Sequence, residues 1–155
     1  MDDFFSENTV TGKPLEILVV EDAALHAKAT LAALEQLPFR QRVSLVRDGA
    51  AAIRFLRQEG IYRRAPRPEL VMLDSSLLSP ACDGPLDVLR TTPELAEVQV
   101  IVVADAEEEG LVELPSCVRH LLRKPVQLDS FLAVMRAIRD EVQHQGRFGA
   151  LDLVG

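Results

Sequence analysis

The chain has 155 residues, of which 48% are hydrophobic and 26% charged, so it can fold around one buried core. Its net charge of -7 and the lack of a dense basic cluster argue against a nucleic-acid surface. No apolar run approaches a membrane span, and the acidic N-terminus lacks a signal-peptide core. Cys82 and Cys117 show neither metal-ligand spacing nor a disulfide pattern. We expect a cytoplasmic domain that binds neither nucleic acid nor membrane.

Strand and helix patterns alternate along the chain, between polar tails at residues 1–14 and 144–155. This alternation in residues 15–143 predicts a three-layer α/β/α sandwich, with a five-stranded parallel sheet of order 2-1-3-4-5. The expected strands are residues 17–20, 43–46, 70–74, 98–103 and 118–122. The expected helices are residues 23–37, 50–58, a segment around 86–89, a short or broken segment near 106–113, and 128–143.

Charged side chains directly follow three of the expected strands. Glu21 and Asp22 come after the first strand, Asp74 ends the third, and Lys124 follows the fifth. A lone Asp74 would more simply end its strand or cap the next turn. In a doubly wound sheet, however, strands one and three are neighbours at the switch point, where ligands bind. A long lysine can reach that edge from strand five, so the group together predicts a site.

The residue types of this group suit phosphoryl transfer to a carboxylate. Three close carboxylates repel one another, and a hard cation such as Mg²⁺ offsets that repulsion. Asp74 would be the nucleophile, and the Lys124 ammonium would bind the phosphoryl group as a point charge. No glycine-rich nucleotide loop follows the first strand, which argues against a dinucleotide or P-loop site. A hydrolase of the haloacid type would need a second Asp where Ser76 stands.

The sequence resembles the receiver domain of the response regulators of two-component signalling, which has a CheY-like, flavodoxin-like fold. The matching pieces, in the family's order, are ILVVED at 17–22, LVMLD at 70–74, DG at 83–84 and KP at 124–125. VRDGAAAIRFLRQEG, RPEL and TTPEL resemble, more narrowly, stand-alone receivers that work with phytochrome-type histidine kinases. The resemblance implies a signalling domain that catalyses only its own phosphorylation and dephosphorylation. It also implies a cis bond within the KP pair.

The resemblance assigns roles by position. Asp74 matches the aspartate that accepts a phosphoryl group from a partner histidine kinase in a Mg²⁺-dependent phosphorelay. Glu21 and Asp22 match the acidic pair that holds Mg²⁺, with Asp22 favoured as the direct ligand. Ser76 matches the position whose backbone carbonyl completes the metal site, and Lys124 matches the lysine that contacts the phosphoryl group. Since the tail is too short for a DNA-binding domain, we expect output through contact with a downstream protein.

The sequence departs from the family at the positions of its switch. Ala104 stands where receivers carry Ser or Thr, so it cannot donate a hydrogen bond to the phosphoryl group. Leu121 stands where an aromatic ring normally changes rotamer. Asp105 would disfavour a phosphoryl group if it pointed inward. Two readings follow: a working phosphoacceptor whose signal is read in another way, which the retained charged residues favour, or a phosphorylation-independent adaptor that uses the fold as a binding scaffold.

The remaining features have simpler interpretations. We expect His120 to be a partly buried strand residue and His26 to be a solvated helix-face residue, although His26 could hydrogen-bond the acidic pair. Gly110 and Pro115 interrupt the expected fourth helix and would leave apolar residues exposed there. The surface formed by the fourth strand, that helix, the fifth strand and the last helix is therefore a candidate for homodimer formation.

Overall fold

The computed structural model describes residues 13–78, 83–105 and 117–154. Its five strands form one parallel sheet in the order β2-β1-β3-β4-β5, which confirms the predicted topology. All five residues of β3, at the centre of the sheet, are buried, and this explains its uninterrupted apolar sequence. The strands are β1 (Leu15–Val20), β2 (Gln41–Val46), β3 (Leu70–Asp74), β4 (Gln99–Ala104) and β5 (His120–Arg123).

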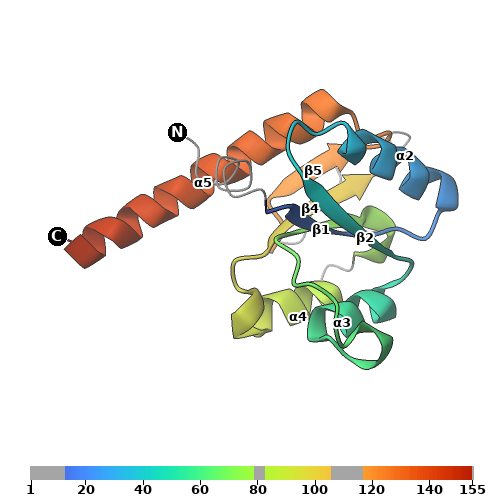
Figure 1. Ribbon diagram of the computed structural model, residues 1–155, viewed down its shortest axis with the longest axis horizontal. Coiled ribbons are helices and arrows are strands. Elements are labelled where there is room, and N and C mark those ends of the chain that lie inside the picture. The colour runs from blue at the N-terminus through green and yellow to red at the C-terminus, as the bar shows by residue number, and fades with distance from the viewer. Residues whose placement is uncertain (1–12, 79–82, 106–116, 155) are drawn as a thin grey trace.

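Helices cover both faces of the sheet, as predicted (Figure 1). The helices α2 (Ala24–Glu35) and α5 (Leu128–Val154) lie over one face. The helices α3 (Gly49–Arg57) and α4 (Pro85–Thr91) lie over the other. Three short 3-10 turns complete the described elements: η1 (Gly60–Tyr62), η2 (Ser75–Leu77) and η3 (Pro93–Leu95). The helix expected near residues 106–113 lies outside the described residues, and with it part of the surface predicted for homodimer formation.

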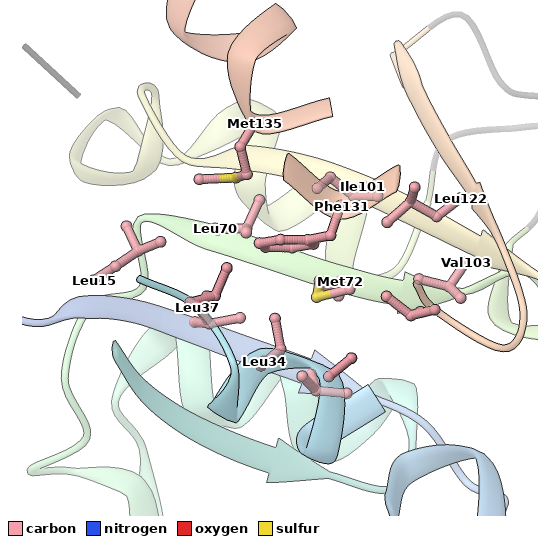
Figure 2. Close-up of a cluster of buried hydrophobic side chains, with 14 of the residues drawn as sticks. Leu15, Leu34, Leu37, Leu70, Met72, Ile101, Val103, Leu122, Phe131 and Met135 are labelled. Carbon is pink, nitrogen blue, oxygen red and sulfur yellow. The ribbon is translucent and has the colours of Figure 1, made fainter. Parts of the chain in front are cut away.

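The sheet separates two apolar layers. Along β3, Leu70 and Met72 face α2 and α5, whereas Val71 and Leu73 face α3 and α4, because successive strand side chains alternate between faces. Figure 2 shows the first layer, in which Phe131 of α5 packs over the sheet. Burying one such side chain contributes roughly 1.5–3 kcal/mol. The two layers thus hold the strand ends, and the charged residues that follow them, in fixed positions.

The structure corrects the predicted end of the last helix. The helix α5 continues to Val154 and extends beyond the sheet, so the expected loose tail after residue 143 is helical (Figure 1). Gly146 and Gly149 lower helix propensity in this stretch, which is why the sequence pattern favoured a tail. Although α5 has 27 residues, neither it nor any other helix among the described residues is apolar enough to cross a membrane.

A disulfide is the second departure from the sequence prediction. Cys117, just before β5, takes part in a disulfide, whereas the cysteine spacing indicated none. The chain's other cysteine, Cys82, lies outside the described residues. Spacing could not have revealed the bond, because pairing depends on which loops the fold brings together.

Candidate functional site: an acidic cluster with a buried lysine

Strand pairing brings the predicted site residues to one edge of the sheet. Because β1 pairs with β3 in parallel, Glu21 and Asp74 lie at neighbouring strand ends. Lys124 follows β5, two strands from Asp74, and its backbone N–H donates to the Ala104 carbonyl at 2.8 Å. The lysine side chain reaches back across the end of β4 to the acidic residues, as the sequence predicted. The Lys124–Pro125 bond is cis, also as predicted.

The carboxylates of Glu21, Asp22 and Asp74 form a compact cluster. One oxygen from each lies within 4.8 Å of the others. Glu21 and Asp74 are 4% and 6% exposed, whereas Asp22 is exposed to solvent. Divalent cations such as Mg²⁺ prefer oxygen ligands, and a site with one exposed carboxylate leaves room for the waters that Mg²⁺ retains. The donor set therefore fits a hard divalent cation.

The Lys124 ammonium lies between the two buried carboxylates. Its Nζ is 2.5 Å from Glu21 Oε1 and 2.6 Å from Asp74 Oδ1. Burial lowers the pKa of Lys124, but its hydrogen bonds to Asp74 and Glu21 and their negative charges outweigh burial, so its pKa lies above 10.5. Burial raises the pKa of Asp74, but hydrogen bonds from Lys124 and Ser76 and the lysine charge outweigh it, so its pKa lies below 3.8. Asp74 is thus ionised at neutral pH, as a nucleophile requires.

Ser76 holds the other oxygen of Asp74. Its backbone N–H donates to Asp74 Oδ2 at 3.3 Å, and its hydroxyl donates to the same oxygen. Sequence reasoning assigned Ser76 only a backbone role, although a serine two residues after an aspartate often bonds locally in this way. With Lys124 on Oδ1 and Ser76 on Oδ2, the Asp74 carboxylate has one fixed orientation. The role of the Ser76 carbonyl as a metal ligand stays a prediction.

Two half-exposed residues, His26 and Asp105, stand at the solvent-exposed side of this cluster, which we call its mouth. His26, on the first turn of α2, places Nδ1 2.9 Å from Lys124 Nζ and 3.9 Å from Glu21 Oε1. Asp105, just after β4, places Oδ1 3.6 Å from Lys124 Nζ, so it points toward the site. The structure thus corrects the view of His26 as a merely solvated residue. Its place in the sequence suggested a hydrogen bond to the acidic pair, whereas the fold places it against Lys124.

The switch positions are apolar, as the sequence shows. Ala104 is 0% exposed at the end of β4, and Leu121 packs against the layer formed with α3 and α4. His120, next to Leu121, is largely buried and lies 3.3 Å from Glu141, in agreement with its expected structural role. The region where receivers usually read phosphorylation therefore carries neither the hydroxyl nor the ring.

Comparisons with known proteins agree with this geometry, although no family model matches the chain. The chain is 34% identical over 98 residues to response regulator Rcp1 of Synechocystis sp. (strain ATCC 27184 / PCC 6803 / Kazusa), covering 62% of this chain and 65% of Rcp1, just under two thirds. The Mn²⁺-bound Rcp1 crystal structure has a TM-score of 0.58 at 30% identity, over 78% of this chain and 89% of that one. The structure of the bacteriophytochrome response regulator AtBRR has a TM-score of 0.63 at 27% identity. The match covers 81% of this chain and 93% of that one. The crystal structure of the phosphorylated cyanobacterial phytochrome response regulator RcpA has a TM-score of 0.57 at 26% identity. The match covers 81% of this chain and 91% of that one.

The sheet order, the acidic cluster and these similarities together define a CheY-like receiver domain. The chain belongs to the response regulators of two-component signalling, and its relatives include phytochrome response regulators. It is accordingly a signalling protein rather than a conventional enzyme. The predicted fold class and family are confirmed.

Proposed function

We propose that the domain accepts a phosphoryl group on Asp74 from a partner histidine kinase, with Mg²⁺ bound beside it. The observation that carries this proposal is the Asp74 carboxylate, held by Lys124 at 2.6 Å within the acidic cluster. Glu21, Asp22, Asp74 and the Ser76 carbonyl would hold the cation, which supplies positive charge that neutralises phosphoryl oxygens.

The protein groups divide the work of the transfer. An Asp74 oxygen forms the new bond to phosphorus while the bond from phosphorus to the kinase histidine breaks. Lys124 donates to a phosphoryl oxygen and offsets its charge. Because Ala104 has no hydroxyl, Lys124 carries this contact without the second donor usual in the family.

Relatives support the partner and the location. AtBRR and RcpA are named phytochrome response regulators, and RcpA was crystallised in a phosphorylated form. A phytochrome-type histidine kinase in the cytoplasm is therefore the proposed donor for this chain. The output would be direct contact with a downstream protein. A homodimer through the surface formed by β4, the helix expected near residues 106–113, β5 and α5 stays a prediction.

Ala104 and Leu121 favour one second candidate, an adaptor that works without phosphorylation. The two candidates differ in their need for a metal. A phosphoacceptor needs Mg²⁺ beside Asp74 at millimolar concentration, whereas an adaptor does not.

Unfolding by urea at 0 and 10 mM Mg²⁺ tests the proposal. For a dissociation constant near 1 mM, we expect Mg²⁺ to raise the unfolding free energy by about 1.4 kcal/mol. Asp22→Asn should remove most of this gain, and Asp140→Asn, which neutralises an exposed carboxylate on α5, should retain it. Equal curves with and without Mg²⁺ for the unmodified chain would favour the adaptor.

A further inference from the structure

The Lys124 ammonium has three acceptors, one for each of its hydrogens. Glu21 Oε1 lies at 2.5 Å, Asp74 Oδ1 at 2.6 Å and His26 Nδ1 at 2.9 Å. A lysine ammonium only donates, so the ring nitrogen of His26 must accept. Asp105 Oδ1, at 3.6 Å, lies beyond normal hydrogen-bond distance and contributes charge only.

The three acceptors differ in how far they are buried, and this difference orients the ammonium group. Glu21 and Asp74 are nearly fully buried, whereas the His26 side chain is 46% exposed. Two hydrogens of the ammonium are therefore donated to buried carboxylates, and the third is donated to the half-exposed ring at the mouth. A phosphodonor must approach Asp74 from the mouth, because the interior side is packed.

We infer that His26 is a positioning residue for Lys124: by accepting the third hydrogen, it holds the ammonium at the mouth, so that the hydrogen now donated to Asp74 Oδ1 can pass to an oxygen of the incoming phosphoryl group. This inference rests on the proposed phosphotransfer to Asp74. Ala104 supports the inference, because a receiver without a hydroxyl there has one fewer hydrogen-bond donor to the phosphoryl group and depends more strongly on the placement of its lysine.

Two substitutions of His26 distinguish the effect of its hydrogen-bond acceptor from the effect of its side-chain volume. His26→Ala removes the acceptor, whereas His26→Asn keeps an oxygen acceptor close to the place of Nδ1. Leu25→Ala is the matched control, since Leu25 lies on the same turn of α2 and is 81% exposed. All three changes keep the three carboxylates of the cluster, and both His26 variants lose equally the 3.9 Å approach of the ring to Glu21 Oε1.

The first readout needs neither metal nor phosphodonor. The chain has only three lysines, Lys13, Lys28 and Lys124, so a ¹H–¹⁵N spectrum of lysine ammonium groups is simple to assign with Lys124→Met. We expect a slowly exchanging Lys124 signal in the unmodified chain, in His26→Asn and in Leu25→Ala. In His26→Ala its hydrogens should exchange with water about tenfold faster, or the signal should be lost.

The second readout is the initial rate of phosphorylation by a small phosphodonor at saturating Mg²⁺, followed by intact mass. Loss of one half-exposed hydrogen bond, of ordinary net strength because water competes for it, predicts a fall of about five- to tenfold in His26→Ala. His26→Asn should restore the rate to within about twofold, and Leu25→Ala should match the unmodified chain.

The outcomes are distinguishable. Equal exchange and equal rates in His26→Ala and the unmodified chain would overturn the inference, as would losses of the same size in the Ala and Asn variants. If the unmodified chain takes up no phosphoryl group at all, the proposed function fails. The positioning of Lys124 by His26 is then decided by the ammonium exchange alone.

Discussion

The ends of β1, β3 and β5 differ from the end of β4 in how they use buried space. The ends of β1, β3 and β5 bury Glu21, Asp74 and Lys124, with the lysine in contact with both carboxylates. The end of β4 buries Ala104, which has no polar side-chain group. In a receiver, the first region accepts the phosphoryl group and the second conveys that it has arrived. The acidic cluster and the switch position are therefore separable parts of one sheet edge, and one can change while the other is kept.

The two regions also differ in the free energy that burial costs. Buried charges are costly unless they are paired, and apolar replacements of a buried ion pair are often neutral or stabilising. Stability alone therefore gives no reason to keep the charges of Glu21, Asp74 and Lys124 buried together. The switch region, in contrast, has the apolar residues that packing favours. We interpret this difference as retained phosphoacceptor chemistry beside an altered readout.

Removing the lysine should have the largest effect on the acceptor region. Lys124→Met leaves two buried carboxylates without their cation, so we expect the unfolding free energy at pH 7 without metal to fall by about 3 kcal/mol. Mg²⁺ should recover part of that loss. Urea unfolding measures both changes, with Lys28→Met, an exposed lysine on α2, as the control. An equally small loss in both variants would show that the ion pairs contribute little.

The second-largest effect should be a loss of unfolding free energy at low pH, caused by protonation of Asp74. The pKa of Asp74 in the folded domain is lowered from 3.8, so its contribution to stability is present above pH 3.8 and is lost as the pH falls through the folded value. Metal-free urea unfolding between pH 7 and pH 2.5 should therefore show a steeper acid decline in the unmodified chain than in Asp74→Asn. Asp140→Asn, at an exposed carboxylate, should keep the steep decline, and a decline of the same slope in all three would refute this assignment.

Restoring a hydroxyl to the switch region should have a smaller effect. Ala104→Ser buries a hydroxyl at a position with 0% exposure, which we expect to cost about 1 kcal/mol without a phosphoryl group. It should raise the phosphorylated fraction at a fixed donor concentration by about threefold, because the hydroxyl gains an acceptor. Intact mass measures that fraction. Ala104→Cys adds similar volume with a weaker donor, and an equal rise there would point to packing rather than hydrogen bonding.

The smallest effect should come from the charge at the mouth. Asp105 is 52% exposed and lies 3.6 Å from Lys124 Nζ, so its repulsion of an incoming anion is partly screened by water. We expect Asp105→Asn to raise the phosphorylation rate by about twofold at low salt and less at high salt. Asp140→Asn should leave the rate unchanged. A slower rate in Asp105→Asn would mean that Asp105 assists the lysine rather than opposing the donor.

Chain order and strand composition were enough to predict the sheet and the acceptor region. A buried parallel strand reads as an apolar run, and a charged residue directly after it must lie at the sheet edge, as Asp74 does. The contact between His26 and Lys124 was not predictable in this way. It depends on the rotation of α2, whose alanine-rich sequence is compatible with several buried faces. The disulfide of Cys117 depends on loop geometry, and the continuation of α5 runs against local propensity.

The central claim is that Asp74 still accepts a phosphoryl group although the switch positions are altered. The most direct measurement is intact mass after incubation with Mg²⁺ and a small phosphodonor, with Asp74→Asn in parallel. The account predicts a single phosphoryl adduct that requires both Mg²⁺ and Asp74. No adduct from two different small donors and from a panel of histidine kinases would contradict it and would identify the domain as an adaptor.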